Sequence, residues 1–547
     1  MNTPLATHSG KSVKRLLRQA VRALRTDQFS NAIRFIDEVL ERQPENVRAN
    51  ALKFTTYYMN QQLEKARLVG AKAAELNPKS EYILNNHACL QLGVGKAAEA
   101  KALLSSLVEQ YGDNPQWLYN LGLSHAQLGE FDLAIHTFRR VLDIQPDYHK
   151  ALLQLASVQL KLGLHEDVFQ TLNMLRLVNP SQHTSSASHI YHALRFNQLD
   201  KESLSQEIAI WGDHFIPKNK AYENQSIAPN KALKLGFVIG STLSFEWKTM
   251  VRPLINAIAK LDHEITVYWH QSGVLPVSTS KNIRIENCRS LSDADFARLC
   301  RNPQNDILID VGGMHTQTRE RAYGINLANK QYAWLVHAGI FSTDLIENLD
   351  EKLGSYTFAI QESTPSNNTK KTNTLPEKYI AAIGCEAGLS LKTVETWSKI
   401  LHQSHLTLVL DVEREAIQQQ LLKRFANFGI SDTFIQFDAH IKTKPRDLVL
   451  DNLDYNAIGK ATTALMDGAT VITLKGELFP TTRTAALLEQ TKNTQWIGKN
   501  EQDYVDLALK LIKTKKKNTR IKTQIKQSGV GDIDKFSQHF LSTLTAT

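Results

Sequence analysis

The sequence has few cysteines, and they form no pattern that binds zinc or builds a disulfide framework. Four cysteines occur in 547 residues, far apart and without a CxxC pair. Closely spaced cysteine pairs are the usual ligands of structural zinc, and small secreted domains carry cysteines at high density. The four cysteines therefore predict reduced thiols in a cytoplasmic protein that has no structural zinc site.

Long apolar runs are also missing. No stretch reaches the roughly eighteen apolar residues that a membrane-spanning helix needs. Residues 1–11 are polar and lack the apolar core of a secretory signal. We therefore expect neither a membrane span nor a secretory signal.

The excess of positive charge is small, since 64 Lys and Arg stand against 55 Asp and Glu, a net charge of +9. Basic residues concentrate in two segments, 11–25 and 513–526. Such segments suit nucleic acid, an acidic protein or an anionic membrane surface. Because no aromatic residues or base-reading motif accompany them, we interpret both as solvated helix faces and do not expect a nucleic-acid partner.

A 34-residue repeat organises the N-terminal part. Proline recurs on this period, and the one missing position is another helix breaker; the positions are Pro44, Pro78, Gly112, Pro146 and Pro180. Thirty-four residues is the tetratricopeptide period. Within the best copy, Gly122 and Ala134 let two helices approach closely, and Leu121 and Phe138 fill the space between them. We predict about five repeats stacked in a solenoid that holds a protein or peptide on its concave surface.

After residue 231 the pattern changes to strands alternating with helices, which predicts parallel sheets with right-handed crossovers. The predicted domains are a solenoid at 1–180, capping helices and a linker at 181–231, a Rossmann-like unit at 232–362, and a second one with C-terminal helices at 363–547. Expected strands of the second unit include 379–383, 406–410, 448–450 and 471–474, and an expected helix begins near Thr462. Ligands of open α/β folds bind at the carboxyl ends of the strands.

Two stretches resemble the O-GlcNAc transferase family (glycosyltransferase family 41, with its SPINDLY-type members). In 306–339 the family pattern is matched at Asp306, Leu308, Gly313, Arg319, Ala328, Gln331, Trp334, Leu335 and Gly339. In 447–473 it is matched at Asp447, Leu450, Asp451, Asn456, Leu465, Gly468 and Thr473. The resemblance implies a solenoid followed by a GT-B fold, and inverting transfer of a sugar from a nucleotide donor to Ser or Thr of a bound protein. It implies no metal or cofactor, leaves the donor unidentified, and carries Asn456 over as a donor-binding residue.

The sequence departs from the family where the donor binds. Phe245 stands in place of the family's histidine after the first strand, and Gly388 in place of the lysine that faces the donor diphosphate. Ile458, Gly459 and Lys460 replace the His-Thr-Thr that binds the phosphates. These changes imply an unusual donor or a loss of catalysis.

Other residues are candidates to replace the lost groups. Gly459 and Lys460 lie between a strand end and a helix start, where N–H groups and a lysine meet phosphate, although Lys460 also fits an ordinary surface lysine. Arg483 near a helix start suits a phosphate or a salt bridge with Glu477 or Glu489. As catalytic candidates, Glu246 suits a general base or an exposed first-turn carboxylate, and His337 suits a site residue or a structural histidine.

Two hypotheses remain. The first is an active protein glycosyltransferase, which a cluster of Lys460, Arg483 and His337 in the cleft would favour. The second is an inactive relative that acts as a scaffold or partner of an active enzyme, which apolar filling by Phe245, Ile458 and Ile340 would favour.

Overall fold

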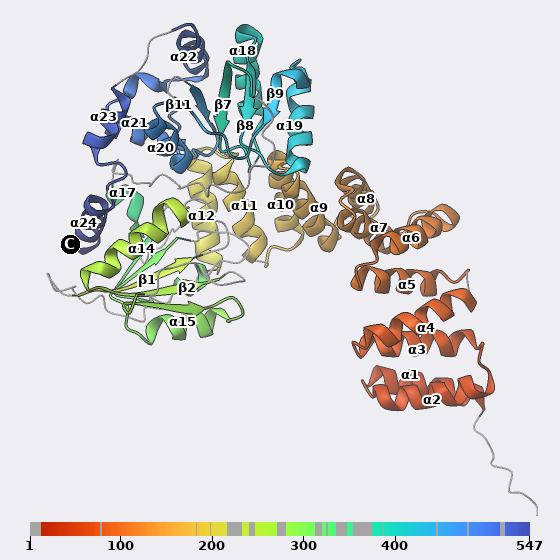
Figure 1. Ribbon diagram of the computed structural model, residues 1–547. Helices are drawn as coiled ribbons and strands as arrows, with labels where there is room; N and C mark the ends of the chain where they lie inside the picture. The colour runs from red at the N-terminus through yellow and green to blue at the C-terminus, as the bar shows by residue number, and fades with distance from the viewer. Residues whose placement is uncertain are drawn as a thin grey trace, which may run out of the picture. The chain divides into compact units, whose positions relative to one another are not determined.

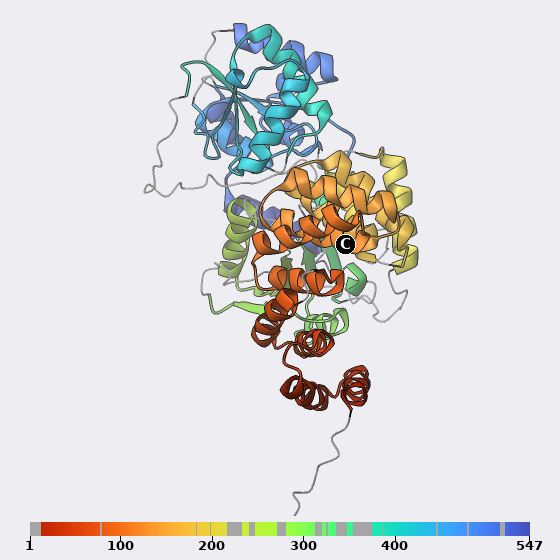
Figure 2. The ribbon, with the colours of Figure 1, turned by 90° about the vertical axis from the view of Figure 1, so that its right-hand side faces the viewer.

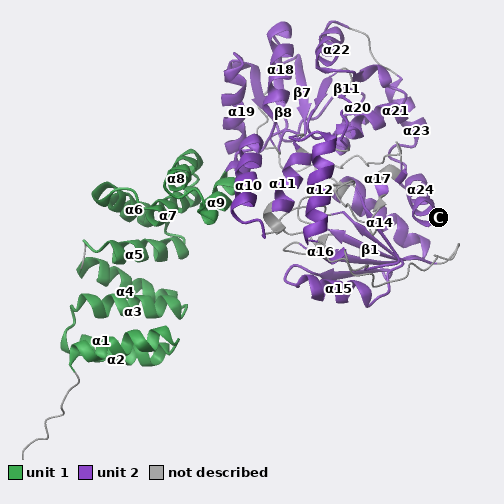
Figure 3. Cartoon of the chain, turned by 180° about the vertical axis from the view of Figure 1, so that it is seen from behind, with its two compact units in different colours: residues 1–158 green, residues 159–547 purple. Residues whose placement is uncertain are grey.

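The computed structural model describes residues 12–76, 79–181, 183–196, 198–215, 232–239, 247–270, 280–311, 320–323, 327–334, 347–353, 375–386, 388–444, 447–478, 481–514 and 520–546. The chain divides into two compact units, residues 1–158 and residues 159–547 (Figure 3). The boundary predicted at residue 180 falls inside the second unit, and those at 231 and 362 lie outside the described residues.

Unit 1 is a stack of helix pairs, drawn in red to orange in Figure 2. Its helices are α1 (Val13–Arg25), α2 (Phe29–Arg42), α3 (Val47–Met59), α4 (Leu63–Leu76), α5 (Glu81–Gly93), α6 (Ala97–Tyr111), α7 (Pro115–Gln127), α8 (Phe131–Ile144) and α9 (His149–Lys161), which crosses the boundary. A Cβ atom at Gly122 would lie 2.6 Å from Cε1 of Phe138, so the glycine lets α7 and α8 pack closely, as its place in the repeat predicted.

Unit 2 begins with the end of the solenoid and continues into two parallel sheets. The solenoid helices are α10 (His165–Val178), α11 (His183–Arg195) and α12 (Lys201–Phe215). The first sheet has the order β3-β2-β1-β4-β5-β6. Its strands are β1 (Lys234–Ile239), β2 (Glu264–Trp269), β3 (Ile283–Asn287), β4 (Ile307–Asp310), β5 (Lys330–Ala333) and β6 (Glu347–Asn348). Its helical segments are η1 (Trp247–Val251), α14 (Arg252–Ile258), η2 (Ala259–Leu261), α15 (Asp293–Arg301), α16 (Glu320–Tyr323) and α17 (Leu349–Leu353).

The second sheet has the order β12-β11-β10-β7-β8-β9. Its strands are β7 (Tyr379–Ile383), β8 (Thr407–Leu410), β9 (Ile435–Phe437), β10 (Leu448–Asp451), β11 (Thr470–Leu474) and β12 (Ile497–Gly498). Its helical segments are α18 (Leu391–Ser404), α19 (Glu415–Asn427), η3 (Asp432–Phe434), α20 (Ile458–Asp467), α21 (Arg483–Gln490), η5 (Thr494–Trp496), α22 (Glu501–Lys513) and α23 (Ile521–Ser528). Both α20 and α22 pack on β10 and β11, on opposite sides of β11 in Figure 1. The predicted fold class, a tetratricopeptide solenoid followed by tandem Rossmann-like units, is confirmed.

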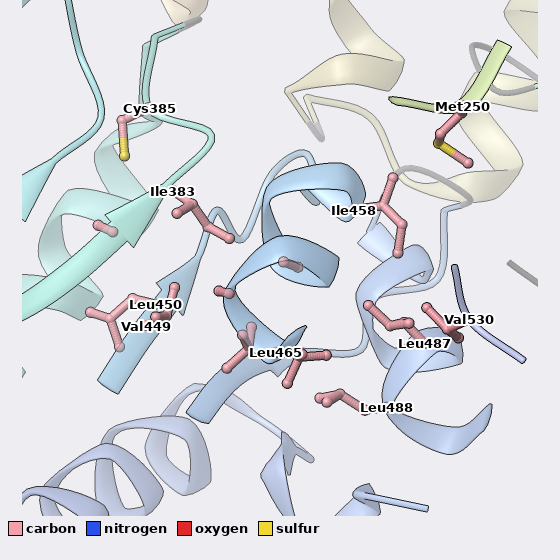
Figure 4. Close-up of a cluster of buried hydrophobic side chains, with 14 of the residues drawn as sticks. Met250, Ile383, Cys385, Val449, Leu450, Ile458, Leu465, Leu487, Leu488 and Val530 are labelled. Carbon is pink, nitrogen blue, oxygen red and sulfur yellow. The ribbon is translucent and has the colours of Figure 1, made fainter. Parts of the chain in front are cut away.

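The last helix, α24 (Ile533–Thr545), returns to the first Rossmann-like unit. It packs against α14 and α17, and the ring of Phe540 lies 4.9 Å from that of Trp334. A continuous buried cluster joins the two Rossmann-like units, with Met250 from the first and Ile458 from the second (Figure 4).

Candidate functional site

The carboxyl edge of the second sheet holds the described candidate residues. In the order β12-β11-β10-β7-β8-β9, the direction of strand addition reverses between β7 and β10. Ligands of open α/β sheets bind at this switch point, outside the carboxyl ends of the strands. The loops after β7, β8, β10 and β11 form this edge, so the residues that follow these strands are the ones to examine.

Lys460 forms an ion pair at this edge with Asp411, the first residue after β8. Its Nζ lies 2.6 Å from Oδ2 of Asp411. Asp411 is 3% exposed and also accepts hydrogen bonds from the N–H groups of Gly384, at 2.8 Å, and Cys385, at 2.7 Å. Burial lowers the pKa of Lys460, but the charge and hydrogen bond of Asp411 raise it more, so the net shift is upward. Lys460 is therefore a charged, oriented cation, not an isolated surface lysine.

The start of α20 differs from the sequence prediction. The expected helix began near Thr462, with Gly459 and Lys460 before it, whereas the helix begins at Ile458 and includes both in its first turn. The start was missed because the N-cap residue is Ala457, which has no polar side chain to signal a helix start. Lys460 thus stands in the turn where backbone N–H groups and the helix dipole favour anions.

Two buried polar side chains hold this turn in place. Oδ1 of Asp451 accepts the N–H of Ala457 at 2.9 Å, and Oδ2 accepts the hydroxyl of Thr473 at 3.2 Å. Burial raises the pKa of Asp451 to about 7. Asn456 is fully buried and accepts the N–H of Thr484 at 3.1 Å through Oδ1. The structure therefore places Asn456 in the link between α20 and α21, below the surface of the edge.

Arg483 begins α21 and is 6% exposed, so its guanidinium is buried within the protein. Of the two carboxylates considered as its partners, Glu489 pairs with Lys475 at 2.8 Å. Arg483 and Lys460 belong to the same edge of the sheet, but Lys460 reaches toward β8 while Arg483 follows β11.

Gly388 lies in the loop after β7 and packs against the solenoid. Its φ is +96°, and a Cβ atom there would lie 2.5 Å from Nε2 of His165 and 3.0 Å from the carbonyl oxygen of Gly163. Both the positive φ and the close contacts exclude a side chain at this position. The lysine that the family resemblance expects at residue 388 has no room in this structure.

Glu166, at the start of α10, fastens the same loop. Its carboxylate accepts the N–H of Leu391 at 2.8 Å and a guanidinium N–H of Arg424 at 2.9 Å. Arg424 also donates to the carbonyl oxygen of Leu389. The Arg424 side chain is 9% exposed and that of Glu166 is 24% exposed, so the pair is partly shielded from water. Through these contacts the start of α10, at the end of the solenoid, is bound to the loop after β7 and to α19 of the second sheet.

A cavity of about 370 Å³ opens at the same edge, between residues 198–201 and the loops after β10 and β11. Its lining includes Lys201, Lys392, Asp454 and Glu477. Asp454 is held by the hydroxyls of Ser390 and Thr393, each at 2.8 Å. The carboxyl edge therefore has a cavity of small-ligand size, but Lys460 is not among the residues that line it.

Glu246 and His337, the two catalytic candidates, lie outside the described residues, as do Phe245 and Ile340. Ile458 is 1% exposed and belongs to the apolar cluster that joins the two Rossmann-like units. Within the described ranges, no group of His, Cys, Asp or Glu side chains is arranged to hold a metal ion. Over the same ranges, no helix has the length and apolar character that crossing a membrane requires.

Sequence reasoning missed Asp411 and Glu166. Asp411 directly follows a buried strand, a signal that would have marked it, because polar residues at carboxyl strand ends reach the ligand edge. Glu166 offered no signal, because its partner Arg424 is 258 residues away in the chain.

Comparisons with known proteins agree with this architecture. The tetratricopeptide repeat family model matches residues 17–81, 85–149 and 124–167. A mutant of the Thermobaculum terrenum O-GlcNAc transferase is similar in structure, with a TM-score of 0.63 and 18% identity over 84% of this chain and 96% of that one. MamA from Desulfovibrio magneticus matches with a TM-score of 0.31 and 16% identity over 32% of this chain and 99% of that one.

No curated protein matches the sequence. The family match and the structural match together show tetratricopeptide repeats followed by α/β domains with a fold similar to that of an O-GlcNAc transferase.

Proposed function

We propose that the protein is a glycosyltransferase that moves a sugar from a nucleotide donor to Ser or Thr of a protein held by the solenoid. The observation that carries the proposal is the position of Lys460, in the first turn of α20 at the switch point of the second sheet. The similarity in fold to an O-GlcNAc transferase, over 84% of this chain, supports this reaction class.

The chemistry asks for a group that takes the charge of the leaving phosphate. Lys460 and the N–H groups of the first turn of α20 are suited to this role, because a helix N-terminus favours anions. Asp411 orients the lysine and offsets part of its charge. A donor phosphate would therefore compete with Asp411 for Lys460.

The donor is expected to differ from that of the family. Gly388 carries no charge where the resemblance expects a lysine, and Arg483 is buried. Removing one protein group that stabilises the developing negative charge through a hydrogen bond typically slows a reaction about 10²–10³-fold. An active enzyme with this edge would need a donor whose phosphate charge Lys460 and the helix start can hold.

A second candidate function is that of an inactive relative that acts as a scaffold. Two observations favour it. Solenoid residues His165 and Gly163 occupy the space that a side chain at residue 388 would need. Ile458 is buried in the apolar cluster that contains Met250 (Figure 4). In this case the Rossmann-like units have only a structural role, and the solenoid binds a partner protein.

The deciding experiment is a thermal-shift titration of the full chain with UDP, GDP, CMP and dTDP. A nucleotide at about 100 times its Kd adds about 2.7 kcal/mol to the free energy of unfolding, which shifts Tm measurably. We expect a shift with one nucleotide, lost in Lys460→Ala and kept in Lys510→Ala, which removes an exposed lysine on α22.

Because Lys460→Ala leaves Asp411 buried without its partner, a second variant removes both charges, Lys460→Met with Asp411→Asn. Loss of the nucleotide shift in both variants supports the donor site. No shift with any nucleotide in the unmodified protein would contradict the enzyme and favour the scaffold.

A further inference from the structure

The first helix of the solenoid carries a cationic face. Helix α1 buries an apolar side made of Leu16, Leu17, Ala20 and Ala23. Its Lys and Arg residues are all exposed: Lys14, Arg15, Arg18, Arg22 and Arg25. At 3.6 residues per turn these five positions fall within an arc of about 100°, directly opposite the buried side. We call these five side chains the cationic face of α1; it runs about 17 Å along the helix.

The sequence supplies little negative charge near this face: its first carboxylate is Asp27, an exposed residue two positions after Arg25. Residues 1–26 contain no Asp or Glu, so the residues before α1 cannot neutralise it either. Among the described residues, no ion pair joins any of the five cations to a carboxylate. The neighbouring helices do pair their charges, Arg42 with Glu38 and Lys53 with Asp37.

The terminal helix of a solenoid needs a polar face toward water. Positive and negative side chains mixed on that face keep it soluble without repelling one another. Five like charges on one side of a helix repel one another and weaken the helix by a few tenths of a kcal/mol for each close pair, on the order measured for such spacings. A partner that brings negative charge relieves this repulsion. The segment that the sequence alone led us to interpret as a solvated helix face therefore has the electrostatic character of a binding surface.

We propose that the cationic face of α1 binds an acidic segment of a protein partner. Four of the five cations are arginines, whose planar guanidinium groups match carboxylates in a two-pronged geometry. An extended chain of about five residues spans the face, at about 3.3 Å per residue. A short run of Asp or Glu residues is thus the ligand that fits its length and charge.

Two other anionic partners fit less well. Helix α1 contains no aromatic residue on which a base of single-stranded nucleic acid would stack. Its apolar side is buried in the solenoid, so the helix cannot insert into a membrane interface. This surface is independent of the nucleotide site proposed above, because it lies on unit 1 and its test measures binding without any donor.

The test uses the full chain and a fluorescein-labelled oligoglutamate peptide of about ten residues, long enough to span the face. Binding is followed by fluorescence anisotropy in the unmodified protein and in the triple variant Arg18→Gln, Arg22→Gln, Arg25→Gln. The matched control removes three exposed cations of the same unit elsewhere: Arg48→Gln, Lys72→Gln, Lys150→Gln. Melting curves of both triple variants verify that the solenoid stays folded.

We expect the face variant to bind the peptide about tenfold more weakly, and the control variant to stay within about twofold. Raising the salt from about 0.1 M to about 1 M shortens the Debye length from about 10 Å to about 3 Å and should weaken binding to the unmodified protein. Equal losses in both variants, or no saturable binding, would overturn the proposal. So would tighter, face-dependent binding of an oligothymidylate strand or of phosphatidylserine vesicles, which would assign the face to nucleic acid or lipid.

Discussion

Asp411 holds Lys460 at the start of α20 with a distance of 2.6 Å between Oδ2 and Nζ, and the same carboxylate binds two N–H groups of the loop after β7. One buried side chain thus joins the ends of three neighbouring strands, β7, β8 and β10. The lysine that is the strongest candidate for phosphate binding is fixed by the same group that shapes the loop beside it. Ligand binding and loop geometry are therefore coupled at this residue.

Replacing Asp411 should destabilise the protein strongly. In Asp411→Asn one acceptor oxygen becomes an NH2 group that faces N–H donors, and Lys460 loses its counter-charge. We expect the free energy of unfolding to fall by about 3 kcal/mol, as for other broken buried pairs. Urea unfolding measures it, with Glu395→Gln as the control, since Glu395 pairs with Lys399 on the surface. A loss as small as the roughly 0.5 kcal/mol expected of the control would contradict this account.

The loop after β7 should not tolerate a side chain at residue 388. In Gly388→Ala the new Cβ would meet His165 and Gly163 while the backbone stays at a φ of +96°. We expect a loss of about 3 kcal/mol in the free energy of unfolding. Gly429→Ala is the matched control: its φ is +76°, but its nearest neighbour would be 3.5 Å away, so only the backbone strain of about 1 kcal/mol applies. Equal losses would show that the contact with the solenoid does not matter.

Glu166 and Arg424 should be energetically coupled. A double-mutant cycle with Glu166→Gln and Arg424→Met removes the charges at nearly constant volume. We expect a coupling energy of about 1–3 kcal/mol, because the pair is partly shielded from water and also binds backbone groups of Leu391 and Leu389. The exposed pair of Glu386 and Arg414 provides the comparison cycle, with an expected coupling below about 1 kcal/mol. Couplings of the same size in both cycles would refute the clamp between solenoid and sheet.

The repeats and the strands could be predicted from the sequence because their signals are local. Gly122 and Phe138 occur at fixed offsets of the repeat, and the structure packs them against each other. The strand predicted at 379–383 has those bounds in the structure, since a buried parallel strand is a continuous apolar run that ends at Gly384. Patterns of this kind depend on neighbours in the chain.

Contacts between distant segments could not be predicted in the same way. The sequence grouped the C-terminal helices with the second Rossmann-like unit by their order in the chain, and nothing local indicates that Phe540 packs on Trp334. The start of α20 lacked a capping residue, and the clamp on Glu166 joins segments that no local pattern relates. At the candidate site, Lys460 could be named from its place after a strand, but its ion pair with Asp411 could not.

Two buried groups should give unit 2 opposite dependences on pH. The pKa of Asp451 is raised by burial from 3.8 to about 7, so between these values the folded protein binds more protons than the unfolded chain. Its contribution to the free energy of unfolding therefore falls as pH rises through this window. The pKa of His189 is lowered, mainly by burial, from 6.5 to about 4, so here the unfolded chain binds more protons. Its contribution is present above pH 6.5 and is lost as pH falls toward about 4.

Single variants should separate the two effects, each on the order of 3 kcal/mol across its window. Relative to the unmodified protein, Asp451→Asn should gain stability as pH rises from about 4 to about 7, because the group that loses stability with rising pH is gone. His189→Phe, which keeps the stacking on Phe169, should show the reverse trend. Urea unfolding at several pH values between about 4.5 and 7.5 measures both. If either variant gave a stability curve parallel to that of the unmodified protein, that residue would not titrate in this range, and its burial would have to be offset by a partner of opposite charge.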